Sequence, residues 1–169
     1  MTRPLRIDVV GGWYHVTARG IERRSVFRDD RDNAHFLELL EEMRERYAVT
    51  VHAYVLMGNH YHLLIQTPEA NASQALQWLN VSYSAWFNRR HGRCGPLFQG
   101  RFKSVLVDGN GGWALEASVY VHLNPVRVKW IRQGDEAERY WDRLKAGMAI
   151  GSTTFLERVR ARVKGDKRE

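Results

Sequence analysis

Residues 50–67 read TVHAYVLM-GN-HYHLLIQT, and this stretch decides the fold class. Residues 50–57 and residues 60–67 are both rich in β-branched and aromatic side chains, which is typical of strands. The Gly58-Asn59 pair between them is typical of a tight turn. We therefore predict two antiparallel strands that are joined as a hairpin.

The second strand of this hairpin carries two histidines. Side chains two positions apart on a strand point to the same face, so His60 and His62 project together. The intervening apolar residues point to the other face, toward the predicted helices: Tyr61, Leu63 and Ile65. Neutral imidazole is a common metal ligand, and it can serve Mg²⁺ or Mn²⁺ if oxygen ligands complete the site. The pair alone also fits two polar residues on a half-exposed strand.

The hairpin lies in the middle of an alternating series of strands and helices. We predict strands at 13–19 and 101–108, a helix at 30–47, and a longer helix that ends near residue 90 and is capped by Asn71 or Ser73. The resulting order is β-α-β-β-α-β. This order predicts an α+β, ferredoxin-like split βαβ sandwich, in which an antiparallel sheet has helices on one face.

A further helix is predicted from residue 113 to about residue 124. Pro125 limits it, because the residue before a proline resists the helical conformation. One of its stripes is apolar and is predicted to face the core: Leu115, Val119, Leu123 and Val126. Beyond residue 130 we predict one or two short helices, the last over 152–164, as a basic C-terminal extension of a 1–130 domain.

An adjacent stripe of this helix holds Glu116, Tyr120 and Asn124 at four-residue spacing. If the stripe lies against the open face of the sheet, Asn124 can offer an amide oxygen to a metal held by the histidines. Tyr120 then stands beside a phosphate bound at that metal. The alternative is that Tyr120 is a half-buried packing residue and Asn124 a helix-end residue.

The composition narrows the class of protein and of partner. The chain has 169 residues, of which 44% are apolar and 27% charged, as in an ordinary globular domain. Its net charge of +7 suggests a polyanionic partner, with nucleic acid first and an anionic membrane surface second. No apolar run is long enough for a membrane span, no secretory signal is evident, and Cys94 is the single cysteine. We therefore expect a cytoplasmic, nucleoid-associated protein without a membrane partner.

Four blocks of the sequence together resemble one protein family. HYHLLIQT (60–67), preceded by Gly58-Asn59, resembles the histidine–hydrophobic–histidine signature of single-tyrosine "HUH" transposases, and YVHLNPVR (120–127) resembles their tyrosine motif. WYHVTARGIERRSVF (13–27) and LFQGRFKSVLV (97–107) are similar to the REP-associated, insertion-sequence-200-like branch. The blocks occur in the family's order and cover roughly residues 8–130.

The resemblance implies a metal-dependent enzyme that cleaves and rejoins single-stranded hairpin DNA. His60, His62 and Asn124 would be the metal ligands, although many relatives have glutamine at the third position. Tyr120 would be the nucleophile and would form a 5′-phosphotyrosine, which a later hydroxyl can reverse without ATP. Relatives occur as dimers or monomers, so either a monomer or a homodimer is expected.

Several other residues are candidates for DNA contacts or for supporting roles. Cations in or beside the loops at the element ends are expected to contact phosphates, among them Arg19, Arg23, Arg101 and Lys103. Interspersed aromatic residues would stack on bases unless they belong to the core: Trp13, Tyr14, Phe98 and Phe102. His15 and Glu116 are candidates for a position just behind the metal ligands or the tyrosine.

Two other functions compete with the transposase. A non-catalytic module that binds single-stranded nucleic acid predicts aromatic side chains on the open sheet face and no need for Tyr120. A zinc hydrolase or structural zinc protein would use His60, His62 and a third histidine. For a metal enzyme, activity should fall as the pH drops through about 6.5, the ordinary pKa of an imidazole.

Overall fold

A five-stranded sheet separates two layers of helices. The structure is a computed structural model that describes residues 7–110, 112–130, 149–150 and 152–165. The strands lie in the order β2-β3-β1-β4-β5. Their bounds are β1 (Gly12–Arg19), β2 (Thr50–Met57), β3 (His60–Thr67), β4 (Lys103–Val107) and β5 (Ala149–Ile150). Strands β1 to β4 pair antiparallel throughout, so the ferredoxin-like α+β prediction is confirmed.

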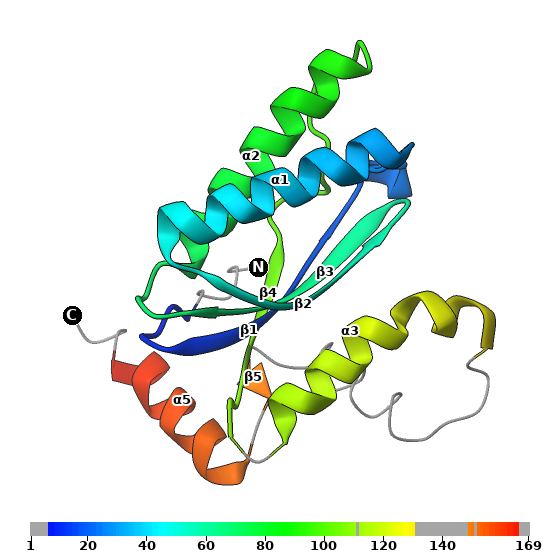
Figure 1. The fold of residues 1–169 in the computed structure, drawn as a ribbon. Coiled ribbons are helices and arrows are strands. Elements are labelled where there is room, and N and C mark those ends of the chain that lie inside the picture. Colours follow the sequence, from blue (N-terminus) through cyan, green and yellow to red (C-terminus); the bar gives the residue numbers. More distant parts are fainter. Residues whose placement is uncertain (1–6, 111, 131–148, 151, 166–169) are drawn as a thin grey trace.

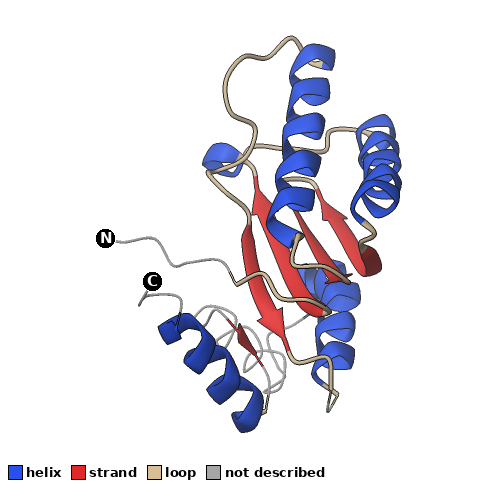
Figure 2. Ribbon diagram, turned by 90° about the vertical axis from the view of Figure 1, so that its left-hand side faces the viewer, coloured by secondary structure: helices blue, strands red, loops and turns tan. Residues whose placement is uncertain are grey.

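The helices divide between the two faces of the sheet. They are the short 3₁₀ helix η1 (Ile21–Arg23), α1 (Asp30–Tyr47), α2 (Ala72–Arg90), α3 (Trp113–Trp130) and α5 (Thr153–Gly165). Figures 1 and 2 show α1 and α2 together on one face and α3 on the other, which we call the α3 face. No helix within the described residues combines the length and the apolar character that crossing a bilayer requires.

The two faces bury different kinds of side chain. The face under α1 and α2 holds the main core, which is built from large side chains such as Tyr14, Leu63, Ile65, Phe36 and Tyr83. The α3 face holds a smaller cluster: Ala53, Val55, Leu64, Val105, Val107, Ala117, Tyr120 and Val121. Each large apolar side chain that is fully buried contributes about 1.5–3 kcal/mol, so the first face supplies most of the stability.

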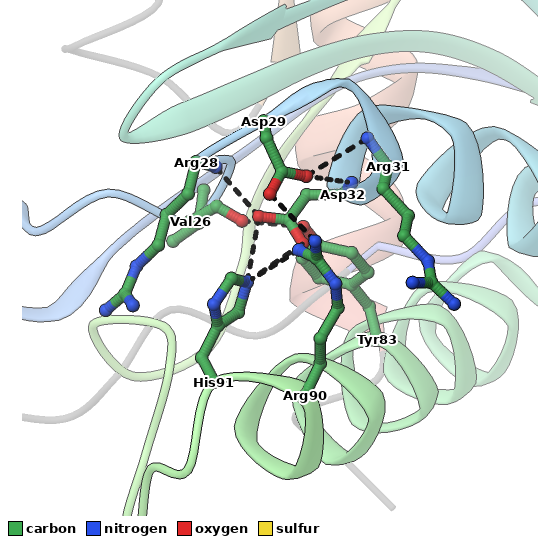
Figure 3. Close-up of polar contacts among 8 residues, drawn as sticks. All are labelled: Val26, Arg28, Asp29, Arg31, Asp32, Tyr83, Arg90 and His91. Atoms are coloured by element: carbon green, nitrogen blue, oxygen red, sulfur yellow. Dashed lines mark hydrogen bonds and ion pairs between the residues drawn. The ribbon is translucent and has the colours of Figure 1, made fainter.

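A buried carboxylate joins the start of α1 to the end of α2 (Figure 3). The side chain of Asp32 is fully buried and accepts a hydrogen bond from the N–H of Arg28 at 2.8 Å. It also contacts the Arg90 guanidinium and, at 2.9 Å, Nε2 of His91. Arg90 reaches Asp29, the N-cap residue of α1, at 2.8 Å as well. A buried charge needs such partners, since losing one typically costs about 3–5 kcal/mol.

The segment around Val26, which precedes α1, supports the turn between β2 and β3. The hydroxyl of Tyr83 donates to the carbonyl of Val26 at 2.6 Å. The N–H of Val26 in turn donates to the carbonyl of Gly58 at 2.8 Å. The N–H of Gly20 donates to the carbonyl of Asn59, also at 2.8 Å. The β2–β3 turn is thus held by backbone contacts to the segment after β1 and is not a free loop.

The bounds of most elements follow the prediction, and three details differ. The strands at 50–57 and 60–67 and the helix at 30–47 are confirmed. The fourth strand is shorter than the predicted 101–108. Asn71 does occupy the N-cap position of α2, but its side chain makes no capping bond and donates instead to the carbonyl of Tyr47 at 2.9 Å.

The third difference is that α3 does not end before Pro125 but continues to Trp130. Proline lacks an N–H, so the carbonyl of Val121 loses its helical partner. The helix continues in spite of this defect, which typically costs about 3 kcal/mol or more. The predicted end at residue 124 is therefore wrong.

The C-terminal part adds a strand that the sequence pattern did not predict. Strand β5 pairs parallel with β4, with Leu106 opposite Ala149. Helix α5 agrees with the helix predicted over 152–164. Residues 131–148 lie outside the described residues, so the division of the chain at residue 130 stays a prediction.

Candidate active site

The α3 face of β3 carries the two histidines. The ring centroids of His60 and His62 lie 5.2 Å apart. His62 is buried and His60 is half-buried. Strand β1 runs alongside in antiparallel register, with Arg19 opposite His60 and Thr17 opposite His62. The predicted shared face of the pair is therefore confirmed.

Protein groups contact the same ring nitrogen, Nδ1, of both histidines. Nδ1 of His60 lies 2.6 Å from Oδ1 of Asn59. Nδ1 of His62 lies 2.9 Å from Nε2 of His15 and 3.0 Å from Oγ1 of Thr17. Metal-binding histidines commonly donate their second ring N–H to a protein acceptor. Within the described part of the chain, these contacts leave the two Nε2 atoms as the nitrogens that can bind a cation.

Burial keeps the imidazoles of this site neutral. It lowers the pKa of His62 to about 2, helped by the neighbouring His15, His60 and Arg19. Burial also lowers the pKa of His15 to about 4. The pKa of His60 is lowered by burial and by the positive charge of Arg19. Neutral imidazoles retain the lone pair that a metal needs, so the acid limb of activity should lie below the ordinary value of about 6.5.

The lowered pKa of His15 predicts a loss of stability in acid. Between pH 6.5 and about 4, His15 is protonated in the unfolded chain but stays neutral in the folded chain. The unfolded state then binds more protons, so the contribution of His15 to the free energy of unfolding falls as the pH drops through this interval and levels off below it. We expect His15 to contribute on the order of 2–3 kcal/mol to this fall.

Urea unfolding at pH 7.5, 5.5 and 4.5 measures this contribution. His15→Gln should lose part of the pH dependence, whereas His35→Gln, a matched change on α1, should keep it. The same pH dependence in wild type and His15→Gln would contradict the prediction.

Tyr120 reaches this pair from the opposite layer. Its side chain is 7% exposed and lies on the α3 face. Its ring centroid is 5.5 Å from that of His15 and 5.9 Å from that of His62, with edge-on geometry to both. His15, His62 and Tyr120, which are far apart in the sequence, are therefore neighbours in the structure.

The predicted core stripe of α3 is wrong where it can be checked. Leu115 is 68% exposed and Val119 is 47% exposed. The buried stripe instead contains Ala117, Tyr120 and Val121. Both stripes have helical spacing. The small side chains of the buried stripe leave space for the Tyr120 ring against the histidine rings of the sheet. The side chains of the other two predicted core residues, Leu123 and Val126, lie outside the described residues.

Two candidates on the same helix are not placed at the histidines. Glu116 is exposed, and no contact between it and the pair is observed among the described residues. Asn124 lies in α3 one turn after Tyr120, but its side chain is outside the described part of the structure. The supporting role of Glu116 and the ligand role of Asn124 stay predictions.

Two of the four predicted DNA-contacting cations flank the histidines. Arg19 is exposed at the end of β1, opposite His60. Lys103 is exposed at the start of β4, opposite Thr17, which itself lies opposite His62. Directly paired residues share a face, so both cations project on the α3 face beside the pair.

The other two cations lie in the neighbouring loops. Arg23 is exposed in η1, and its carbonyl accepts a hydrogen bond from Nδ2 of Asn59 at 3.2 Å. Arg101 is exposed, but it precedes β4 and is not part of the strand as predicted.

The predicted aromatic stacking surface is not found. Tyr14, Phe98 and Phe102 are buried. Trp13 is half-buried and stacks on His52, with ring centroids 3.9 Å apart. These four side chains therefore serve packing, and the α3 face is covered by α3. This arrangement counts against a binding module that stacks bases on an open sheet.

The described donors of this site are the two imidazoles of His60 and His62. Among the described residues, no group of three or more His, Cys, Asp or Glu side chains is arranged to hold a metal. A zinc hydrolase or structural zinc site would need such a group. Two imidazole nitrogens can serve Mg²⁺ or Mn²⁺ if oxygen ligands from an amide, water or phosphate complete the site.

Comparison with known proteins now decides the family. The family model "Transposase IS200 like" matches residues 8–122. The chain belongs to the IS200-like transposase family. The transposase is thus an enzyme of DNA transposition, as expected from the four sequence blocks. No curated protein matches it significantly.

A solved structure shares the fold of this transposase. A REP-associated tyrosine transposase bound to a REP hairpin matches with a TM-score of 0.63 and 18% identity, over 79% of this chain and 78% of that one. A proposed transposase from Deinococcus radiodurans R1 matches with a TM-score of 0.49 and 15% identity, over 72% of this chain and 96% of that one.

Sequence reasoning missed two polar residues that contact the pair. The sequence pattern marks Asn59 only as a turn residue and Thr17 only as a strand residue. Both touch an Nδ1 atom of a histidine. Two features of the sequence indicate these contacts. Asn59 directly precedes His60, and Thr17 lies two positions after His15, so it shares a strand face with it.

Proposed function

We propose that this transposase cleaves and rejoins single-stranded DNA beside a hairpin. Tyr120 is the nucleophile, and His60, His62 and Asn124 hold Mg²⁺ or Mn²⁺. The observation that carries the proposal is the edge-on contact of the Tyr120 ring with His62, on a face where two Nε2 atoms remain for a cation. A nucleophile and a metal platform from different layers of the fold thus meet at one place.

The chemistry is a reversible transesterification. The phenolic oxygen of Tyr120 attacks the phosphorus and loses its proton, while the bond from phosphorus to the 3′ oxygen breaks and that oxygen takes up a proton. A divalent cation bound at the histidines would offset negative charge on the non-bridging phosphate oxygens. The 5′-phosphotyrosine keeps the phosphate activated. A 3′-hydroxyl can therefore attack it, release Tyr120 and join strands without ATP.

Hairpin DNA is the substrate class that the available observations favour. The similar solved transposase is bound to a REP hairpin, which supports either transposition or the processing of REP elements. The net charge of +7 favours a polyanionic partner. We propose that the transposase acts as a monomer or a homodimer, and that residues 131–169 form a basic extension of the catalytic domain.

A gel assay with end-labelled hairpin DNA tests the proposed function. Because Tyr120 would retain the 5′-phosphate fragment, DNA labelled at its 3′ end should form a covalent adduct with the protein on a denaturing gel. DNA labelled at its 5′ end should instead release a shorter free strand. Both products should require Mg²⁺ or Mn²⁺ and disappear with EDTA. Retarded DNA without an adduct, across a range of hairpins, would favour the non-catalytic binding module.

Arg19 and Lys103 should contribute phosphate contacts beside the site. Replacing either by glutamine is expected to weaken hairpin binding, and to reduce the slope of log affinity against log salt concentration by about 0.7 for each lost contact. Fluorescence anisotropy between 50 and about 300 mM salt measures both effects. The control is Arg44→Gln, because Arg44 pairs with Glu41 on α1. Equal slopes in all proteins would exclude these two contacts.

A further inference from the structure

Asn59 forms a bridge between the loop after β1 and the ring of His60. Its Nδ2 donates to the carbonyl of Arg23 at 3.2 Å, and its Oδ1 lies 2.6 Å from Nδ1 of His60. A carbonyl can only accept, so the contact with Arg23 requires the NH₂ group and turns Oδ1 toward the imidazole. Oδ1 also can only accept, and therefore Nδ1 of His60 must carry the hydrogen.

The backbone on both sides of this bridge is firmly held. The carbonyl of Asn59 accepts from the N–H of Gly20. A side chain at Gly20 would meet the carbonyl oxygen of Arg24 at 2.1 Å, so only glycine permits this close approach. Arg23 adopts a left-handed φ of 59°, which turns its carbonyl within the 3₁₀ turn. The acceptor for Nδ2 is thus part of the scaffold, and it in turn fixes the amide plane.

The turn itself does not require asparagine at this position. Asparagine is often chosen for its tolerance of positive φ, but Asn59 does not use it. The non-glycine residues with positive φ in the described chain are Glu22, Arg23 and Ala48. The contacts of the side chain therefore distinguish Asn59 from an ordinary turn residue.

We propose that Asn59 is a positioning residue that holds His60 in the tautomer with its hydrogen on Nδ1, and so presents the Nε2 lone pair for metal binding. The inference rests on the proposed function for the use of that lone pair. The inference adds that His60 already has the tautomer required of a metal ligand before any cation binds. Without Asn59, binding would have to select one tautomer and one ring orientation from a mixture, which lowers the affinity.

Nitrogen NMR of the metal-free protein tests the tautomer directly. Long-range ¹H–¹⁵N spectra distinguish protonated from unprotonated ring nitrogens, and the signals of His60 are identified by their loss in His60→Gln. We expect Nδ1 protonated and Nε2 unprotonated in the wild type, and a mixture of tautomers in Asn59→Ala. Asn59→Asp keeps an acceptor and should keep the wild-type pattern. A wild-type His60 that carries its hydrogen on Nε2 would overturn the proposal, even if the alanine variant did not fold.

Calorimetric titration with Mn²⁺ tests the consequence. Asn59→Ala should bind Mn²⁺ about 10–100-fold more weakly than the wild type, and Asn59→Asp at least about fivefold more tightly than the alanine variant. The matched control is Asn71→Ala, since Asn71 also donates to a backbone carbonyl but lies at the start of α2. Equal affinities of wild type and Asn59→Ala would refute the positioning role. Failure of the proposed function looks different: the expected tautomer would be present, but no DNA adduct would form.

Discussion

Tyr120→Phe is expected to abolish the covalent DNA adduct and to slow nicking by at least about 10³-fold. Removing the hydroxyl removes the only atom of this side chain that can attack phosphorus, and loss of a nucleophile is among the largest single-residue effects in enzymes. Phenylalanine keeps the ring, so the edge-on packing against His15 and His62 should persist. Affinities for Mn²⁺ and for hairpin DNA should stay within about threefold of the wild type.

The adduct assay with 3′-labelled hairpin DNA measures this effect, and anisotropy and calorimetry measure the two affinities. Tyr54→Phe is the matched control, because Tyr54 is 47% exposed on β2 and lies outside the site cluster. It should form the adduct at the wild-type rate. If Tyr120→Phe still formed an adduct, another residue would have to be the nucleophile and the assignment of Tyr120 would be wrong.

The hairpin shows why so much of the fold could be predicted from the sequence. The strand-forming composition of 50–57 and 60–67, with the Gly58-Asn59 turn between them, constrains this stretch to two antiparallel strands whose side chains alternate between two faces. The observed bounds and the shared face of His60 and His62 follow from that constraint. The order of strands and helices then leaves few compact arrangements.

The orientation of α3 could not be predicted by the same reasoning. Leu115 and Val119 form a stripe with helical spacing, and so do Ala117 and Val121. Apolar character favours the first stripe, but the structure buries the second. The choice depends on the shape of the sheet face, where histidine rings leave room for Tyr120 between small neighbours. That information comes from tertiary packing and not from the helix.

The polar contacts around the histidines depend on register and backbone geometry. His15 meets His62 only because β1 and β3 pair with Thr17 opposite His62. The contact of Asn59 with His60 needs the carbonyl of Arg23, which a turn with positive φ supplies. The local pattern of residues predicts neither the register of strand pairing nor a left-handed φ. The sequence can therefore suggest which residues lie near the histidines, but the contacts themselves depend on the three-dimensional structure.

His62→Gln is expected to remove the metal site and with it most of the activity. Glutamine is polar and of similar size, but it lacks the imidazole nitrogen that remains for a cation, and it also removes the contact of Nδ1 with His15. We expect the dissociation constant for Mn²⁺ to rise at least about 100-fold. Adduct formation should fall about 10²–10³-fold, which corresponds to losing about 3–4 kcal/mol of electrostatic stabilisation.

The affinity for Mn²⁺ distinguishes this variant from Tyr120→Phe, which should bind Mn²⁺ normally and lose only the attack on phosphorus. The matched control is His52→Gln, since His52 is an exposed histidine that stacks on Trp13 and makes no contact with the pair among the described residues. It should bind Mn²⁺ and form the adduct as the wild type does. Thermal unfolding verifies that His62→Gln is folded. A folded His62→Gln protein that bound Mn²⁺ normally would show that the cation lies elsewhere, because a site with two imidazole ligands cannot lose one of them without a large loss of affinity.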